Sequence, residues 1–462
     1  MAVLGITVVL LHLAEAAEPL PPPLAQALLE PGAYRDPERL IVKLSEDSIV
    51  RWDNGLQGST DVVLNGLLST AKPLFSRSPE ALQKESLQVD PDGRLSQLNR
   101  YLQVHHPNAA QLGQQLKQYP EISHVYLASL PVPPPSDVPP ETPLFEQAYR
   151  HGFPEGLSID VQHDWPDAKG QGVTIVDIEY GWSSTHEDLT AAPEDVAWGW
   201  NFNEYIYHGN AVLGLIIADH NGFGISGIAP EAEVQIVSPF PEENDYNVAD
   251  AISAATDILS SGDVLLIEQQ GYVDNLFCPV EVEPAVFDAI ALAVAKGIIV
   301  VEPTGNGSIN LDGSDWGDWF NPDVQDSGAM MVGGGASPLS GFEPRTWYPN
   351  GSAYGRRVDL QAWFDSTVTL GGPGMVDLFF PDGDVNQAYT AQFGGSSGAS
   401  AMVAGISAVV SGVSLSRWEQ PIPPIQLREN LVISGFGAES STPFVIGPQP
   451  DLRQFLWRHS LR

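Results

Sequence analysis

The chain has 462 residues, of which 43% are apolar, so a large buried core is expected and a wholly disordered protein is excluded. Its formal net charge of −37 argues against binding to nucleic acid, whose phosphates require Lys and Arg. Residues 1–135 carry 10 basic and 14 acidic groups, whereas residues 136–462 carry 11 and 44, so the acidity belongs to the second part. The single cysteine, Cys278, excludes an internal disulfide and a cysteine-based zinc site.

The beginning of the chain has the composition of a secretory signal. An apolar stretch from Ala2 to Leu13 is followed by the small residues Ala14, Ala16 and Ala17. The sequence therefore predicts a signal peptide at 1–17 and a secreted protein, extracellular or periplasmic. The alternative is a buried N-terminal strand, although the prolines that follow it would interrupt such a strand. Other apolar runs are too short to span a bilayer, so we expect no stable membrane insertion.

Residues 18–130 predict a small α+β unit, and a proline-rich stretch predicts a linker over 131–150. Apolar and β-branched residues predict strands at 39–44, 98–104 and 122–130. A helix is expected at 108–119, because Asn108 is a good N-cap and Leu112 and Leu116 stack one turn apart.

Residues 151–462 predict an α/β domain, with a mainly parallel sheet covered by helices on both faces. Short apolar runs alternate with helical segments, as in βαβ units. The expected strands are 173–178, 234–237, 264–267, 298–301 and 330–332, and the expected helices include 247–259, 284–296 and 424–432. In such sheets functional groups gather at the carboxyl ends of the strands.

Four residues at predicted element boundaries could form a hydrolytic site. Asp177 ends a strand, His208 precedes a glycine at a helix start, and Ser397 opens a helix of small residues after a glycine pair. Asn306 lies in a glycine-flanked turn, from which its amide could donate to an oxyanion. Each feature alone is also typical of a turn, a cap or a glycine-rich loop. Their joint occurrence in this order favours a catalytic site.

From about Gln171 to Val410 the sequence resembles subtilisin-like serine proteases. VDIE stands for the aspartate motif, HGNAVLG for H-G-T-H-V-A-G, TGNG for the family's G-N, and GGSSGASAMVAG for G-T-S-M-A-S-P-x-V-A-G. The resemblance implies an endopeptidase with Asp177 orienting the base, His208 as base and Ser397 as nucleophile. Asn306 and the N–H of Ser397 would form the oxyanion hole. The N-terminal unit resembles the family's inhibitory pro-domain, which implies a self-processed precursor.

The sequence departs from the family pattern at several positions. Glu179 is placed at a normally glycine position, and we expect a solvated turn residue there. The alternative is that its charge steers cationic substrates or raises the pKa of the histidine. Ala211 replaces the second histidine, and Gly398 and Ala401 replace the usual Met and Pro after the serine. These changes indicate a divergent branch.

The same resemblance implies further site residues and partners. The chemistry needs no cofactor, but a structural Ca²⁺ would be held by the side chains of Asp188 and Asn221 and by backbone carbonyls. The partners would be protein or peptide substrates and the chain's own pro-domain. The implied carbonyl ligands are Asp219, Phe223 and Ile225, and the implied substrate-pocket walls are Gln269, Gln270, Gly271, Pro303, Thr304 and Gly305.

Two alternatives stay open at this point. GGSSG also fits the nucleophile elbow of an α/β-hydrolase esterase, with Ser396 as nucleophile and Asp451 and His459 after it. The chain could also be a protease-like scaffold that binds peptides without cleaving them.

Overall fold

The computed structural model describes residues 20–46, 48–52, 56–59, 61–91, 95–132, 146–372, 375, 377–379, 383–438 and 442–460. The predicted signal peptide at 1–17 and most of the predicted linker lie outside the described residues.

The N-terminal unit contains a four-stranded antiparallel sheet in the order β4-β5-β1-β6. The predicted strands and helix are confirmed, although Leu98–Arg100 forms a 3₁₀ turn and the strand begins only at Tyr101. Apolar residues of the sheet and its helices form a core of their own. The bounds are α1 Pro22–Ala27, β1 Arg35–Leu44, β2 Arg51–Trp52, β3 Leu56–Gln57, α2 Val62–Leu67, β4 Lys72–Pro73, α3 Pro79–Val89, β5 Tyr101–His105, α4 Ala109–Leu116 and β6 Ile122–Ser129.

The second part of the chain is built on a six-stranded parallel sheet in the order β14-β13-β12-β9-β7-β8. All five predicted strands and the predicted helices are present, which confirms the α/β fold class. The strands are β7 Thr174–Ile178, β8 Glu233–Val237, β9 Val264–Ile267, β12 Ile299–Pro303, β13 Met330–Gly335 and β14 Leu360–Trp363. Successive apolar side chains of β9, β12 and β13 enter two separate cores in alternation, as the pleat requires.

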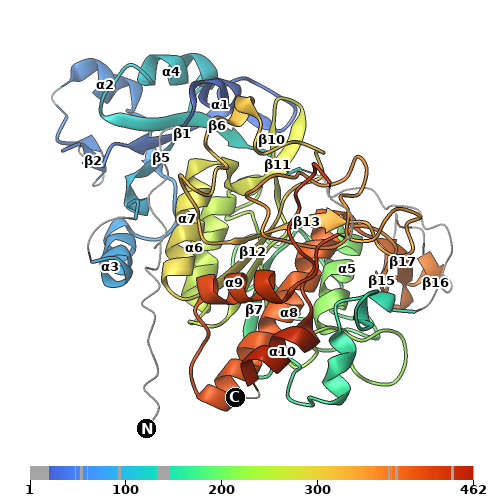
Figure 1. The fold of residues 1–462 in the computed structure, drawn as a ribbon. Helices are drawn as coiled ribbons and strands as arrows, with labels where there is room; N and C mark the ends of the chain where they lie inside the picture. Colours follow the sequence, from blue (N-terminus) through green and yellow to red (C-terminus); the bar gives the residue numbers. More distant parts are fainter. Residues whose placement is uncertain are drawn as a thin grey trace, which may run out of the picture.

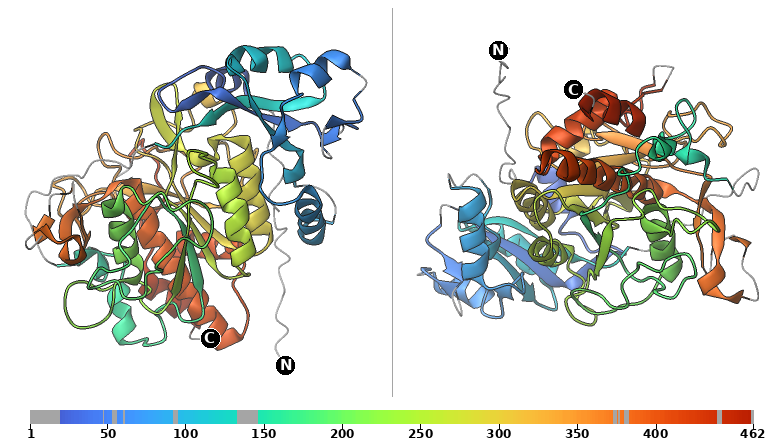
Figure 2. Two further views of the ribbon diagram at one scale, coloured as in Figure 1. Left: turned by 180° about the vertical axis from the view of Figure 1, so that it is seen from behind. Right: turned by 90° about the horizontal axis from the view of Figure 1, so that it is seen from below.

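Helices cover both faces of this sheet (Figure 1). The helices α5 (Ile206–Ile217) and α8 (Gly395–Trp418) pack on one face, and α6 (Val248–Ile258) and α7 (Pro284–Ala295) pack on the other. The reverse view in Figure 2 shows the same three layers. Two helices near the C-terminus, α9 (Pro424–Ser434) and α10 (Leu452–Ser460), lie outside α8.

By length and composition, α8 could span a membrane, but 94% of its apolar window is buried inside the protein. Its apolarity therefore reflects its position as the central core helix. Among the described residues, no other helix meets the length and composition required for a span.

The remaining strands are short and were not predicted. A hairpin of β10 (Gln270–Val273) and β11 (Leu276–Pro279) follows β9. A three-stranded antiparallel sheet, β15-β17-β16, precedes α8. Its strands are β15 Thr367–Leu370, β16 Asp377–Phe379 and β17 Tyr389–Phe393, and the last leads directly into α8.

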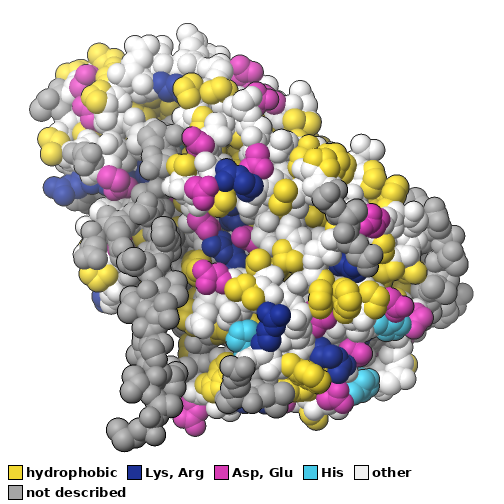
Figure 3. Space-filling view, in the orientation of Figure 1, with side chains coloured by type: hydrophobic (Ala, Val, Ile, Leu, Met, Phe, Trp, Pro, Cys, Tyr) yellow, Lys and Arg dark blue, Asp and Glu magenta, His cyan; other side chains and the backbone are white. Residues whose placement is uncertain are grey.

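The N-terminal unit lies on α6 and α7 (Figures 1 and 2). Asp288 of α7 is buried and accepts hydrogen bonds from Tyr101 at 2.6 Å and from Lys43 at 3.0 Å. Asp250 of α6 accepts a hydrogen bond from the backbone N–H of Ser76 at 3.0 Å. On the face of the molecule drawn in Figure 3, Lys and Arg side chains lie next to Asp and Glu side chains. Cations of the N-terminal unit pair with carboxylates of the acidic domain in Arg35–Glu283, Arg39–Asp245 and Arg77–Asp257.

Candidate active site

The candidate site lies where the central strands of the parallel sheet end. The neighbours β7, β9 and β12 are followed directly or within a few residues by Glu179, Glu268 and Asn306. On the face covered by α5 and α8, the first turns of these helices bring His208 and Ser397 to the same edge.

A short hydrogen bond joins His208 to Glu179. Nδ1 of His208 lies 2.6 Å from Oε2 of Glu179, and both side chains are buried. The other oxygen of Glu179 accepts the backbone N–H of Tyr180 at 2.7 Å, so the carboxylate is held at both ends. Gly209 permits this approach, because a Cβ there would lie 2.1 Å from the carbonyl oxygen of Gly181 and 3.0 Å from Cγ of Glu179.

This contact corrects the expectation for Asp177. Among the described residues, neither carboxylate oxygen of Asp177 has a hydrogen-bond partner, although the side chain is fully buried. Burial, and then the neighbouring charge of Glu179, hold the pKa of Asp177 well above its usual range. The expectation of a solvated turn residue at Glu179 is also wrong, because this side chain is fully buried.

The predicted partner of His208 is two residues too early in the chain. Asp177 and Glu179 are two positions apart and therefore share one face of β7, so alternation alone did not separate them. The family's aspartate is followed by Ser or Thr and then Gly, and Glu179-Tyr180-Gly181 preserves that glycine. The position of Gly181, two residues after the carboxylate, is therefore the sequence signal that indicates Glu179.

The first turn of α8 is tied to Asn306. The backbone N–H of Ser396 donates to Oδ1 of Asn306 at 2.9 Å. The amide NH₂ of Asn306 donates to Oε1 of Gln270 at 3.5 Å, and its second N–H is able to donate to another acceptor. Ser397 is 6% exposed, whereas Ser396 is 1% exposed, so Ser397 is the more accessible of the two hydroxyl groups.

The turn that carries Asn306 requires a glycine. Gly305 has a φ of +80°, and a Cβ there would lie 2.7 Å from the carbonyl oxygen of Cys278. The backbone carbonyl of Gly305 accepts the N–H of Ala353 at 3.0 Å. The turn is therefore fixed from both sides.

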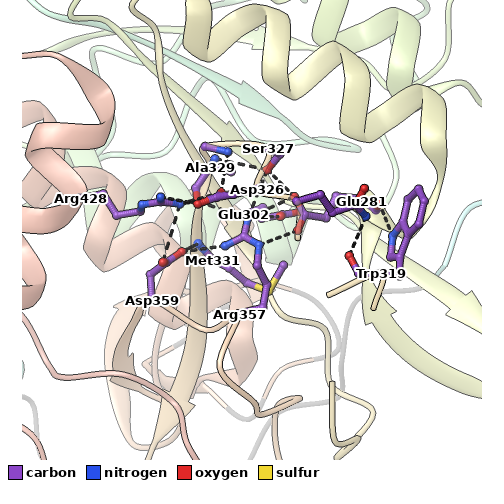
Figure 4. Close-up of polar contacts among 12 residues, drawn as sticks. Glu281, Glu302, Trp319, Asp326, Ser327, Ala329, Met331, Arg357, Asp359 and Arg428 are labelled. Carbon is purple, nitrogen blue, oxygen red and sulfur yellow. Dashed lines mark hydrogen bonds and ion pairs between the residues drawn. The ribbon is translucent and has the colours of Figure 1, made fainter. Parts of the chain in front are cut away.

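A buried ion network supports the strand that leads into this turn (Figure 4). Glu302 on β12 lies 3.8 Å from the guanidinium of Arg357, which also pairs with Glu281 at 2.9 Å and with Asp359 at 2.8 Å. Arg428 of α9 lies 3.8 Å from the same Asp359. The network thereby links β12, the start of β14 and α9.

Glu268, which the sequence analysis did not single out, is a third buried carboxyl group at the site. It is 4% exposed and follows β9 directly. Its position one residue beyond an apolar strand resembles that of Glu179 beyond β7, and this parallel is the sequence signal that could have found it.

The expected pocket-wall residues lie beside the site, but several of their polar groups are already engaged. The side chain of Gln269 accepts from Tyr246 at 2.8 Å and donates to the carbonyl of Ile178 at 3.2 Å. Oε1 of Gln270 accepts the N–H of Asn306 at 3.1 Å. Gly271 pairs with Cys278 in the hairpin, and the N–H of Thr304 donates to the carbonyl of Val332. Pro303 is the last residue of β12. Their role in substrate binding stays a prediction.

Several of the residues expected to hold Ca²⁺ contact one another, but their side-chain oxygens accept N–H groups. Asp188 accepts the amide NH₂ of Asn221 at 2.8 Å and the backbone N–H of Ile225 at 2.8 Å. The amide oxygen of Asn221 in turn accepts the N–H of Phe223 at 3.1 Å. Within the described ranges, no cluster of three or more His, Cys, Asp or Glu residues could hold a metal ion. In this arrangement the side-chain oxygens of Asp188 and Asn221 accept N–H groups, whereas the backbone carbonyls of Asp219, Phe223 and Ile225 stay predicted ligands.

The esterase alternative does not fit the geometry. Asp451 accepts the hydroxyl of Ser158 at 2.8 Å, and His459 contacts the carbonyl of Phe455 within its own helix. Both residues belong to α10 or its start, whereas Ser396 lies in the first turn of α8, where its backbone N–H donates to Asn306.

Comparisons with known proteins agree with this geometry. The profile of the subtilase family matches residues 170–432. An intracellular serine protease of Paenibacillus polymyxa is 28% identical over 165 residues, which cover 33% of this chain and 48% of that protein. The minor extracellular protease Epr of Bacillus subtilis (strain 168) is 27% identical over 151 residues, which cover 32% and 22%. The chain thus spans less than half of the length of these two relatives.

A similar fold is found in fervidolysin from Fervidobacterium pennivorans, a keratinolytic enzyme related to subtilisin. The TM-score is 0.61 at 16% identity, covering 96% of this chain and 63% of that one. The match of the family profile to more than half of the sequence shows that the chain belongs to the subtilase family.

Proposed function

We propose that this protein is a serine endopeptidase that hydrolyses peptide bonds through Ser397, His208 and Glu179. The observation that carries the proposal is the buried hydrogen bond between His208 Nδ1 and Glu179 Oε2. A carboxylate on Nδ1 fixes the imidazole tautomer that leaves Nε2 to act as the base, which is the role of the acid in a catalytic triad. Glu179 takes that role here in place of the expected Asp177.

In the proposed reaction, Ser397 Oγ attacks the scissile carbonyl carbon while His208 accepts the hydroxyl proton. The amide NH₂ of Asn306 and the N–H of Ser397 would donate to the resulting oxyanion. The C–N bond then breaks as His208 returns the proton to the leaving amine. Water, deprotonated by His208, next attacks the acyl-enzyme and releases the acid, which regenerates Ser397.

Replacing either serine tests this proposal. Ser397→Ala should lower hydrolysis of a mixed peptide library by about 10⁶-fold, because only binding and the oxyanion donors remain. Ser396→Ala should have a far smaller effect, since the contact with Asn306 is made by its backbone. A fully active Ser397→Ala protein would contradict the proposal, and an inactive wild type would favour the non-catalytic scaffold.

We also propose that the protein is secreted and is made as a precursor inhibited by its N-terminal unit. The polar contacts that this unit makes with α6, α7 and the N-cap of α7 support its docking. At the end of the unit, the carbonyl of Val132 accepts the hydroxyl of Tyr180 at 3.1 Å, one residue from Glu179. A covalently attached segment has an effective concentration in the millimolar range, so even weak docking keeps a cleft occupied.

Intact masses of wild type and Ser397→Ala, expressed side by side, test the precursor proposal. Cleavage is expected between about Ala128 and Gly156, the stretch that contains the proline-rich linker predicted from the sequence. Only the wild type should lose the N-terminal unit. If the wild type hydrolyses peptides while both proteins keep that unit covalently attached, the precursor proposal is wrong.

A further inference from the structure

Glu268 occupies the central position at the catalytic edge of the sheet. It follows β9, whose two neighbours β7 and β12 lead to Glu179 and Asn306. Its backbone N–H donates to the carbonyl of Ile178 at 3.3 Å, which continues the β7–β9 pairing up to Glu179. Glu268 therefore lies between the carboxylate that holds the base and the asparagine of the oxyanion hole.

The side chain of Glu268 reaches the first turn of α8 through Ser400. Oγ of Ser400 lies 2.8 Å from Oε1 of Glu268 and 2.9 Å from the carbonyl oxygens of both Ser396 and Ser397. All three neighbours are acceptors when Glu268 is ionised, but a hydroxyl group has only one proton. A proton on Glu268 resolves this conflict, because Glu268 then donates to Ser400, and Ser400 donates to the carbonyls.

The surroundings of Glu268 also favour the neutral acid. Among the described residues, its Oε2 is buried with no hydrogen-bond partner, which is costly for an ionised carboxylate. The groups that act on it are Asp177 and Glu179 from the β7 side, His208 from α5 and Ser400 from α8. Burial raises the pKa of Glu268 well above its usual range, reinforced by Asp177 and Glu179 and opposed by His208 and by the hydrogen bond with Ser400.

We propose that Glu268 is a positioning residue that works as a neutral carboxylic acid, holding Ser397 and its N–H in place through Ser400. This inference rests on the proposed function of Ser397. Ionisation of Glu268 would remove the proton that orders Ser400. It would also place a negative charge near the oxyanion, where like charges repel. The neutral acid therefore supports the transition state more than it supports substrate binding, and loss of its proton should lower kcat more than it raises KM.

Two substitutions distinguish whether the neutral acid or the carboxylate of Glu268 is the functional form. Glu268→Gln stays uncharged at every pH and keeps an N–H that can donate to Ser400, whereas Glu268→Ala loses the contact. Across pH 5–10, we expect kcat of wild type to fall on the alkaline side and that of Glu268→Gln to stay level. Glu268→Ala should lower kcat about tenfold or more at all pH values, a loss of the size expected for one buried hydrogen bond. If Glu268→Gln is as impaired as Glu268→Ala, the carboxylate is the working form and the proposal is wrong.

A second measurement does not depend on proteolysis. The full chain carrying Ser397→Ala is unfolded with denaturant at several pH values, with and without Glu268→Gln. A raised folded pKa means that the stability contributed by the acid is complete below the unfolded value of about 4.3 and is lost as pH rises through the folded value. The ratio of folding constants, Glu268 over Glu268→Gln, should therefore fall about tenfold per pH unit between the unfolded and the folded pKa, and it should level off above the folded pKa. A flat or rising ratio overturns the inference, whatever the peptidase assays show.

Discussion

Nδ1 of His208 and Oε2 of Glu179 are 2.6 Å apart, and both groups are shielded from water. Asp177, two residues earlier on the same face of β7, has no hydrogen-bond partner for its carboxylate among the described residues. Of these two carboxyl groups, Glu179 contacts the imidazole. Asp177 is buried without a donor among the described residues, which favours its neutral form and holds its pKa well above the usual range.

This difference predicts opposite effects of two isosteric substitutions. Glu179→Gln should lower kcat by about 10⁴-fold, because an amide in that position allows the wrong imidazole tautomer. Asp177→Asn should keep kcat within about tenfold, since a neutral amide resembles the protonated acid. Steady-state kinetics on one peptide substrate, with circular dichroism as a check of folding, measures both. The reverse order of effects would restore Asp177 as the partner of the histidine.

Asn306 is expected to contribute through its NH₂ group rather than through its oxygen. Asn306→Ala should lower kcat by about 10²–10³-fold with little change in KM, as expected on loss of one oxyanion donor. Asn306→Asp is the matched control, because it keeps the oxygen that accepts the N–H of Ser396 but removes the donor. Both variants should therefore be similarly impaired. An active Asn306→Asp protein would show that the asparagine only supports the first turn of α8.

We expect the loop around Asp188 to keep its structure without calcium. Because N–H groups of Asn221 and Ile225 already occupy its carboxylate, a chelator is expected to leave the melting temperature of Ser397→Ala protein unchanged. Burial raises the pKa of Asp188 to about 6, so any calcium binding there would weaken as pH falls below that value.

Melting curves at pH 5 and pH 8, with calcium or with chelator, check this. Stabilisation by calcium that appears only at pH 8 and is lost in Asp188→Asn would contradict the metal-free loop and support the original expectation. Calcium at a hundredfold excess over its Kd would add about 2.7 kcal/mol to the free energy of unfolding, which is a measurable shift.

Much of the fold could be predicted from the sequence, because the buried strands of a parallel sheet are short, continuous apolar runs. Val264–Ile267 was predicted with its observed bounds, and α6 and α7 to within about two residues. In the second part of the chain, the strands β10, β11, β14, β15, β16 and β17 were missed. They have only three to five residues each, and their pairing depends on tertiary contacts rather than on a local apolar pattern.

The site was predicted in part. The positions of His208 and Ser397 in the first turns of two helices follow from local glycine and small-residue patterns. The partner of the histidine did not follow, because period-two alternation places Asp177 and Glu179 on one face and cannot say which reaches the imidazole. That choice depends on the close approach of α5 at Gly209, which is a tertiary feature. The same holds for Glu268, whose contact with Ser400 joins residues 132 positions apart.

The central claim is that His208, held by Glu179, activates Ser397. Labelling the wild-type protein with a fluorophosphonate probe and locating the modified residue by peptide mapping tests this claim most directly, because the probe reacts only with an activated serine hydroxyl. We predict labelling of Ser397, with the label nearly abolished by Glu179→Gln and retained in Asp177→Asn. Labelling of Ser396, or no labelling of properly folded wild-type protein, would contradict the account.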